Sequence, residues 1–314
     1  MTIGEFITSP SIIRVWLIMK ITFYGVRGSI PSPGPDTCRY GGNTSCVHIE
    51  TASGQDLVLD AGTGIRNLGK RLIKKDSTIH ILMSHGHWDH IQGYPFFKPI
   101  YQPDRQIRVY TTAADSHGQL CSLFDQIDGA NFPIKATELP SQSECITANF
   151  ETELAGQNLC VSRIPLNHPG GGYGYRIEED GTSCAYITDN ELEPPGKAPT
   201  TYDQWVAFCR GADVLIHDAQ YLESDMPQKH GWGHSLVSQA RQLAVDAEVG
   251  CLVMFHHDPD RTDTGIDIIQ KDNEQFFYGC RGPSICLCAA ETMQIQLTPR
   301  QDKRTRIEVS QTAY

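Results

Sequence analysis

Short runs of residues that are apolar throughout, or that alternate between apolar and polar positions, recur along the whole chain. Runs of this length and pattern predict β-strands. They cover residues 21–24, 46–49, 57–59, 79–83, 107–110, 159–164, 184–187, 214–216, 251–255 and 285–287. The chain is therefore expected to be rich in β-structure in both of its halves.

Patterns with a helical period are fewer and lie between these strands. They cover residues 64–75, 113–128, 202–209 and 235–247. Ser235 is the expected N-cap of the last helix. Two β-rich halves with flanking helices predict an α+β protein, built as a four-layer αββα sandwich rather than as a doubly wound parallel sheet.

The pattern also suggests where the folded domain begins and ends. Residues 1–18 are interpreted as an N-terminal extension, 19–298 as one folded domain, and 299–314 as a polar, loosely ordered C-terminal tail. The apolar stretch 12–23 is interrupted by Arg14 and Lys20 and falls short of the roughly 20 residues that span a bilayer. Neither a membrane span nor a signal peptide is expected.

Composition narrows the class of protein. Of the 314 residues, 39% are hydrophobic and 20% charged, which is typical of a globular domain. The net charge of −11 disfavours long polyanions such as nucleic acids, although a local basic groove would still bind one. The 11 cysteines are odd in number and form no CxxC pair, which predicts reduced core residues in a cytoplasmic protein.

One short motif carries most of the chemical information. His85, His87, Asp89 and His90 follow directly after the apolar run 79–83. Imidazole nitrogen and carboxylate oxygen are ligands that zinc accepts, at about 2.0 to 2.2 Å. A solvated, histidine-rich turn would explain one isolated histidine, but it explains a spaced cluster with an embedded aspartate poorly. The motif therefore predicts a metal site, with His85 and His87 on one ion and Asp89 and His90 on another.

Three further ligand candidates each follow a predicted strand. They are His168, Asp189 and His256. A single histidine or aspartate at a strand end is more often structural than functional. Their number, and their order after the first motif, favour a metal-binding role.

This ordered set of residues resembles the metallo-β-lactamase-fold hydrolase superfamily, from about Lys20 to Leu297. The resemblance implies two divalent ions, with zinc expected first and manganese or iron left open. It places His85, His87 and His168 on the first ion, and Asp89, His90 and His256 on the second, with Asp189 between them. Having His87 at the second position is similar to the hydrolases and unlike the di-iron oxidoreductase branch. Asp60, in a turn that also matches the superfamily, would orient the ligand histidines.

Two later motifs resemble the phosphodiesterase branch of that superfamily, which includes ribonuclease Z and small cyclic-phosphate phosphodiesterases. They are the strand 214–218, which ends in Asp218, and the segment 231–235, which contains His234. The resemblance implies that Asp218 orients His234, that His234 protonates the leaving oxygen, and that Asp89 orients the attacking hydroxide. Asp218 stands where ribonuclease Z usually has a glutamate, so its carboxylate reaches one methylene less far.

Resemblance to this branch does not by itself identify the substrate. Only twenty residues separate His168 from Asp189, which leaves no room for the protruding arm of the ribonuclease Z enzymes that bind transfer RNA. Together with the acidic charge, this favours a small phosphodiester, such as a cyclic nucleotide. A ribonuclease-Z-like RNA endonuclease and a glyoxalase-II-like thioester hydrolase are the alternatives, and the intact ligand set disfavours a non-catalytic binding module. A homodimer is left open by analogy with related enzymes.

Two glycine-rich segments and three further histidines each have two interpretations. The glycine-rich segments 25–31 and 40–45 would either line a phosphate pocket or form ordinary turns. His217, His230 and His257 are expected to be supporting or surface residues rather than catalytic ones.

Overall fold

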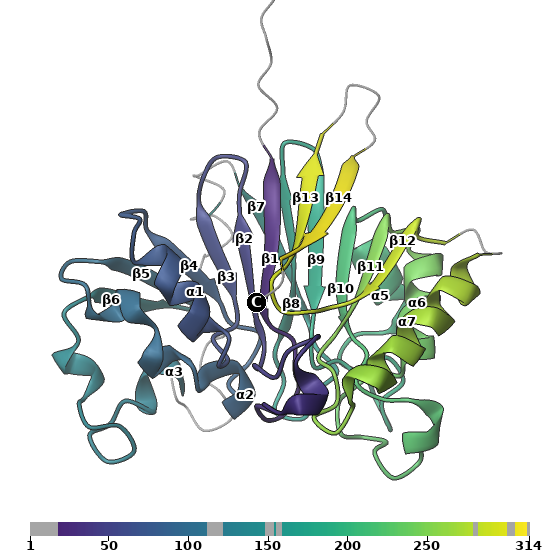
Figure 1. The fold of residues 1–314 in the computed structure, drawn as a ribbon, viewed down its shortest axis with the longest axis horizontal. Helices are drawn as coiled ribbons and strands as arrows, with labels where there is room; N and C mark the ends of the chain where they lie inside the picture. The colour runs from purple at the N-terminus through teal and green to yellow at the C-terminus, as the bar shows by residue number, and fades with distance from the viewer. Residues whose placement is uncertain are drawn as a thin grey trace, which may run out of the picture.

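Two β-sheets pack face to face, with helices on both outer sides, in the computed structural model (Figure 1). The structure describes residues 18–111, 122–147, 154, 159–278, 282–299 and 305–312. This arrangement confirms the predicted αββα sandwich. The N-terminal extension expected for residues 1–18 falls almost entirely outside the described residues and stays a prediction.

The first sheet has eight strands in the order β14-β13-β1-β2-β3-β4-β5-β6. Their bounds are β1 Met19–Gly25, β2 Cys46–Glu50, β3 Asp56–Leu59, β4 Ile79–Leu82, β5 Gln106–Tyr110, β6 Gln142–Ile146, β13 Met293–Thr298 and β14 Arg306–Gln311. The second sheet has six strands in the order β12-β11-β10-β9-β8-β7. Their bounds are β7 Cys160–Pro165, β8 Tyr173–Glu179, β9 Thr182–Ile187, β10 Val214–Asp218, β11 Cys251–Phe255 and β12 Ile285–Cys288.

The helices divide between the two outer faces (Figure 1). The described helices are α1 Ile65–Leu72, α2 Trp88–Ile91, α3 Ser122–Asp125, α5 Tyr202–Cys209, α6 Val237–Asp246 and α7 Asp263–Phe277. Short 3-10 helices in the described loops are η1 Pro35–Thr37, η2 Tyr94–Phe96, η3 Lys98–Tyr101, η4 Ala136–Glu138 and η5 Glu223–Asp225. Helix α1 packs on the first sheet, whereas α5, α6 and α7 pack on the second.

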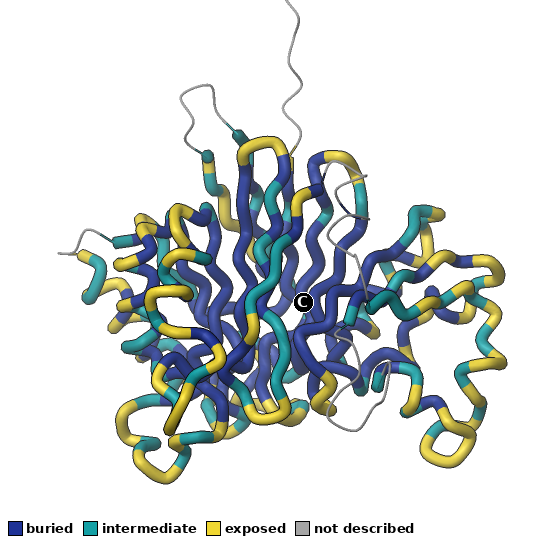
Figure 2. The backbone as a smooth tube through the Cα atoms, turned by 180° about the vertical axis from the view of Figure 1, so that it is seen from behind, coloured by how far each residue is buried: buried dark blue, intermediate teal, exposed yellow. Residues whose placement is uncertain are grey.

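Alternation along the strands builds the layers. In β10, Val214 and Ile216 face the space between the sheets, while Leu215 packs under the outer helices. Strand β11 repeats this pattern, with Val253 between the sheets and Leu252 against the helices. Both faces of these strands are apolar because successive side chains point to opposite sides and both sides are covered. Figure 2 shows the resulting buried centre and the exposed outer loops.

Parallel pairing brings the important loops to one edge. Strands β3 to β6 run parallel in the first sheet, and β9 to β12 run parallel in the second. The carboxyl ends of β9, β10 and β11 are therefore neighbours at the same edge of the second sheet. The loop after β4 leaves the corresponding edge of the first sheet, and α2 lies there (Figure 1).

Every predicted strand is confirmed, with small shifts at the ends. The helices predicted at 64–75, 202–209 and 235–247 are confirmed as α1, α5 and α6. Of the helix predicted at 113–128, only α3 is described, and residues 112–121 lie outside the described residues. The predicted Ser235 cap is wrong, because Leu236 is the N-cap and the Ser235 hydroxyl instead donates to the Asn190 carbonyl at 2.6 Å.

Several elements were missed by the sequence analysis. Helix α7, the longest described helix, begins after Thr262, whose hydroxyl accepts from the Gly265 amide at 3.1 Å. The prediction of a loosely ordered C-terminal tail is partly wrong, because β14 pairs antiparallel with β13 from Arg306 to Gln311. A strand at the edge of a sheet needs few buried side chains, so a polar segment can form one. No helix in the described ranges is long and apolar enough to cross a membrane.

Candidate metal centre

The loop after β4 presents the first four candidate ligands. His87 is the N-cap of the short helix α2 and has an extended backbone. The helical turn that follows directs Asp89 and His90 inward, where their exposed fractions are 5% and 0%. Trp88 points the other way and is 81% exposed. One tight strand-to-helix turn therefore directs neighbouring side chains to different sides, so that a single loop supplies several candidate ligands.

The other three candidates come from separate strand ends. His168 follows β7, Asp189 follows β9 and His256 follows β11. Asp189 and His256 have positive φ angles of 52° and 59°, which non-glycine residues seldom adopt. Backbone strain of this kind persists only where the surroundings enforce it, and it concentrates at functional sites.

Three imidazoles form one group, which we name the first cluster: His85, His87 and His168. Their candidate ligand atoms all lie within 4.8 Å of one another. His168 Nε2 lies 3.0 Å from His87 Nδ1, and the His85 ring lies 4.5 Å from the His87 ring between centroids. His85 is buried, but His87 is exposed. The first cluster therefore opens toward solvent on the His87 side.

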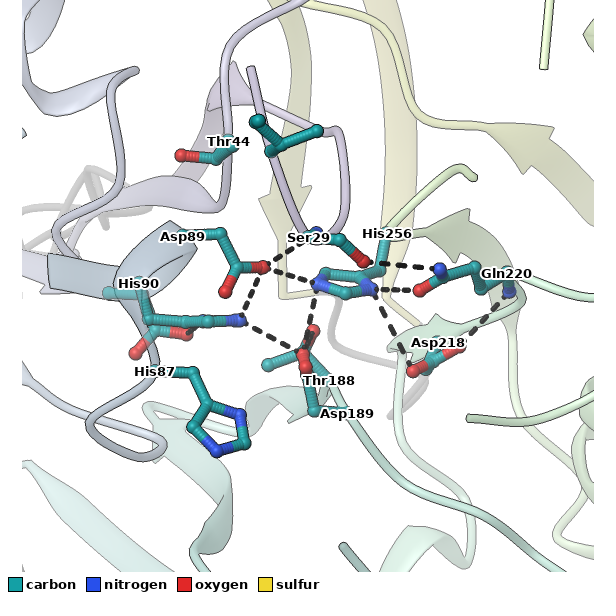
Figure 3. Close-up of polar contacts among 12 residues, drawn as sticks. Ser29, Thr44, His87, Asp89, His90, Thr188, Asp189, Asp218, Gln220 and His256 are labelled. Carbon is teal, nitrogen blue, oxygen red and sulfur yellow. Dashed lines mark hydrogen bonds and ion pairs between the residues drawn. The ribbon is translucent and has the colours of Figure 1, made fainter. Parts of the chain in front are cut away.

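Four residues form the second cluster: Asp89, His90, Asp189 and His256. All four are buried, and their candidate ligand atoms also lie within 4.8 Å of one another. His90 Nε2 lies 3.2 Å from Asp89 Oδ2 and 3.1 Å from Asp189 Oδ1. His256 Nε2 lies 3.1 Å from each of the same two oxygens (Figure 3). Two imidazoles and two carboxylates thus converge on one small volume.

Asp189 joins the two clusters. Its Oδ1 faces the second cluster, while its Oδ2 lies 3.7 Å from His85 Nε2 and 3.9 Å from His168 Nε2 in the first cluster. The structure thus brings together all seven residues that the sequence analysis selected as ligands. Their distribution follows the predicted division, with Asp189 between the two groups.

The donor set fits divalent cations. His85 Nε2 is buried and has no hydrogen-bond partner within the described part of the chain, with Asp189 Oδ2 at 3.7 Å. Burial holds the pKa of His85 well below its usual range, and the pKa of His168 is lowered to about 4, again mainly by burial. Neutral imidazoles in the first cluster suit a transition-metal ion. In the second cluster, burial lowers the pKa of His90, but Asp189, Asp89 and Asp60 outweigh this effect and raise that pKa, and a bound cation would take the place of the proton. Zinc, manganese and iron all accept this set.

A second layer of side chains orients the ligand rings. Asp60 Oδ2 lies 2.9 Å from His90 Nδ1, and the Ser84 hydroxyl donates to the same carboxylate oxygen at 2.8 Å. That hydroxyl also lies 3.0 Å from His85 Nδ1. Tyr186 adds a third contact to Asp60 Oδ2, also at 2.8 Å. The arrangement agrees with the orienting role expected of Asp60.

Two orienting groups were missed by the sequence analysis. Gln220 Oε1 accepts from His256 Nδ1 at 2.9 Å, and the Gly233 carbonyl accepts from His168 Nδ1 at 3.0 Å. Each bond fixes one ring so that its Nε2 points into a cluster. The only sequence signal for Gln220 was its position two residues after Asp218.

Glu191 is the third missed group, and it shapes the segment around Gly233. Its buried carboxylate accepts the amide of Gly231 at 2.9 Å and that of Gly233 at 3.0 Å. Gly233 has a φ of +88°, and a Cβ there would lie 2.1 Å from His168 Nδ1. Glycine is therefore required at position 233, which explains part of the motif seen in the sequence.

Asp218 and His234 form a close pair beside the clusters. His234 Nδ1 donates to Asp218 Oδ2 at 2.6 Å, so the shorter aspartate side chain does reach the ring. The His234 ring stacks on the His256 ring at 5.1 Å between centroids. Burial is the largest single effect and lowers the pKa of His234, but the carboxylates of Asp218, Asp189 and Asp89 together outweigh it and raise the pKa to about 9.

The remaining candidates have structural partners. His217 Nδ1 donates to the Asp218 carbonyl at 2.6 Å, and His257 Nε2 donates to the Ala289 carbonyl at 2.9 Å. His230 is exposed and lies 3.1 Å from the Glu193 carbonyl. These contacts agree with the supporting roles expected for the three histidines.

In the segment 25–31, backbone amides donate to protein groups rather than toward an open pocket. The amide of Gly28 donates to the His257 carbonyl, and that of Ser29 donates to Asp89 Oδ2 at 2.8 Å (Figure 3). A Cβ on Gly28 would lie 2.5 Å from the His256 ring. The segment therefore supports the second cluster, which favours the turn interpretation over a phosphate pocket there.

Comparisons with known proteins agree with this geometry. A family model described as a beta-lactamase superfamily domain matches residues 56–257. Ribonuclease Z from Thermoplasma acidophilum is 42% identical over 307 residues, covering 82% of this chain and 92% of that protein. The chain belongs to the β-lactamase superfamily, and within it to the metallo-β-lactamase-fold hydrolases.

Two solved structures show the same fold. The metallo-β-lactamase fold protein YhfI from Bacillus subtilis covers 93% of this chain and 99% of its own, with a TM-score of 0.61 and 17% identity. A diphosphatase from the PhnP family covers 90% of this chain and 98% of its own, also with a TM-score of 0.61 and 17% identity. At this identity, both likenesses concern the fold alone.

Proposed function

We propose that this hydrolase is a phosphodiesterase that acts on a small phosphodiester, with a cyclic or linear nucleotide as the expected class. The observation that carries the proposal is the 2.6 Å bond between Asp218 Oδ2 and His234 Nδ1, directly beside the second cluster. An alkoxide is a poor leaving group, so its departure from phosphorus requires a proton. A thioester hydrolase expels a thiolate and does not need this pair.

The seven clustered residues are the proposed ligands of two divalent ions. His85, His87 and His168 would hold one ion, and Asp89, His90 and His256 the other, with Asp189 shared. Bound ions of this kind lower the pKa of a coordinated water and neutralise charge on the phosphoryl oxygens. This chain's own contribution is to hold both sets of donors in fixed orientations, through Asp60, Gln220 and the Gly233 carbonyl.

His234 is the proposed general acid, and Asp218 its positioning partner. Asp218 occupies Nδ1 of the ring, which leaves Nε2 as the nitrogen that transfers the proton to the leaving oxygen. Asp218 is fully buried, and its Oδ1 accepts the Gln220 amide at 3.0 Å, so its orientation is fixed. Asp89, whose Oδ2 accepts the Ser29 amide at 2.8 Å, is the proposed group that orients the attacking oxygen.

RNA cleavage is the second candidate, because the Thermoplasma acidophilum relative is a ribonuclease Z. Two observations favour a smaller substrate. The segment between His168 and Asp189 is taken up by the antiparallel pair β8 and β9, so it holds no protruding arm. The net charge of −11 also opposes a long polyanion.

Turnover of matched substrates tests the proposal. The purified chain, supplied with zinc or manganese, should hydrolyse bis(4-nitrophenyl) phosphate and a dinucleoside phosphate faster than it hydrolyses a glutathione thioester or a transfer RNA precursor. His234→Ala should lower turnover of the dinucleoside phosphate by about 10² to 10⁴, with much less effect on the nitrophenyl ester, whose leaving group needs no proton. Metal content should stay near two ions per chain. Faster thioester hydrolysis, or equal loss of metal and turnover, would contradict the proposal.

A further inference from the structure

A cavity of about 210 Å³ opens directly beside His234. Part of its lining is apolar, from Met226, Pro227 and Leu236. Met226 and Leu236 are half-buried, so they provide a partly sheltered surface for a ring. The cavity is smaller than the roughly 300 to 1,000 Å³ of pockets that hold drug-sized ligands, which limits it to a single compact group.

The position of the cavity relates it to the leaving group. Asp218 binds Nδ1 of His234, so Nε2 is the nitrogen available for proton transfer. A general acid must lie within hydrogen-bond reach of the oxygen that it protonates. The alcohol that departs must therefore lie next to His234, and His234 is one of the residues that line this cavity.

The charge of the lining is the third observation. Two carboxylates, Glu191 and Glu193, line the cavity, and no lysine or arginine of the described residues does. Glu191 is 3% exposed and holds its place by accepting the Gly231 and Gly233 amides. Glu193 is exposed at the rim. The imidazoles of His230 and His234 and the amide of Gln239 complete the polar lining.

We propose that this cavity binds the leaving alcohol of the phosphodiester, and that its carboxylates select an uncharged, ring-bearing alcohol over one that carries a further anionic group. The proposal rests on the proposed function and extends it to a substrate class. Nucleoside cyclic monophosphates and nucleotide esters of neutral alcohols meet the requirement. Cyclic dinucleotides and internal bonds of polynucleotides do not, because their leaving side carries another phosphate, which like charges repel.

A pair of aryl esters of thymidine 5′-phosphate tests this selection. One carries 3-carbamoylphenol as the leaving alcohol, and the other carries 3-carboxyphenol, which is nearly equal in size but negatively charged at pH 7. The phenol departs rather than the nucleoside because it is the better leaving group, so the aryl ring must occupy the His234 side. With the metal-supplied full chain, kcat/KM for the amide should exceed that for the carboxylate by about tenfold, corrected for their rates with hydroxide in solution.

Charge-removing variants locate the effect. Glu193→Gln should reduce the preference for the amide by about threefold, since it removes one carboxylate from the rim. Glu223→Gln is the matched control, because Glu223 is an exposed carboxylate in η5 of the same region and does not line the cavity. This control should keep the wild-type ratio.

The outcomes separate the two proposals. Equal corrected kcat/KM for the two esters would overturn the leaving-group cavity, while leaving the phosphodiesterase proposal in place. An unchanged ratio in Glu193→Gln would overturn the role of the Glu193 carboxylate in this selection. If neither ester nor bis(4-nitrophenyl) phosphate is hydrolysed, the proposed function itself fails.

Discussion

The first and second clusters use similar ligands but differ in access to solvent. His87 of the first cluster is exposed and His168 is half-buried, whereas all four residues of the second cluster are buried. The second cluster also receives more support, from Asp60, Ser29 and Gln220. The first cluster is therefore open to solvent at His87, whereas the second cluster is enclosed and is held by more neighbouring groups.

Asp189 is the residue on which this comparison depends most, because each of its oxygens faces one cluster. Asp189→Asn should lower phosphodiester turnover by about 10³-fold or more and reduce the metal content of both clusters. Metal analysis and turnover on the same preparation check this. Asp180→Asn, in the exposed turn between β8 and β9, is the control and should change neither. Retention of two ions and of activity in Asp189→Asn would show that the clusters do not share this residue.

Because the second cluster is more deeply buried, it should contribute more than the first to the stability of the metal-free chain. His256→Gln removes an imidazole that lies 3.1 Å from two buried carboxylates, and it should lower the free energy of unfolding by about 3 kcal/mol. His87→Gln removes an exposed ring and should have little effect. Urea unfolding after chelation measures both variants. Similar losses in the two would mean that the difference in burial has no energetic consequence.

Asp60 supports both clusters, but it does so unequally. It contacts His90 directly, whereas it reaches His85 only through the Ser84 hydroxyl. Asp60→Asn should weaken metal affinity by about 10- to 100-fold, with the larger loss in the second cluster. Competition with a chromophoric chelator gives both affinities, and Asp36→Asn, an exposed aspartate in η1, serves as control. Equal loss in both clusters would contradict the unequal support.

The smallest expected effect concerns a buried histidine away from both clusters. Burial lowers the pKa of His80 to about 4, below the 6.5 of the unfolded chain. Between pH 6.5 and pH 4, His80 is protonated in the unfolded state but not in the folded state. The free energy of unfolding therefore falls as the pH drops through this range. The contribution is about 1 kcal/mol at pH 5.5.

His80→Gln should remove that part of the pH dependence and leave metal content unchanged. Urea midpoints at pH 7.0 and 5.5, for wild type and variant, measure it. The same drop in both proteins would show that His80 does not cause it.

The sequence predicted the local parts of this molecule well. Strands such as β10 and β11 are continuous apolar runs, and the motif from His85 to His90 places four candidate ligands within one loop. The later ligands could not be identified from local sequence alone. His168, Asp189 and His256 are single residues, and they come together only because strand ends meet at one edge of the sheet. Their order along the chain, and the superfamily that this order resembles, identified them.

The missed features have physical explanations. Glu191 and Gln220 act through contacts that only the folded chain creates, such as the bond from Glu191 to the Gly233 amide 42 residues away. Helix α7 has few fully buried apolar positions, since it packs at the outer surface, so its period was weak. Strand β14 is an edge strand with mostly exposed residues, and its polarity resembles that of a tail.

The most direct test is anomalous diffraction from crystals of the full chain grown with zinc. Two peaks per chain are expected, one bound by His85, His87 and His168, the other by Asp89, His90 and His256, with Asp189 contacting both. A single peak, or ions bound outside these seven residues, would contradict the two-ion centre on which the proposed chemistry depends.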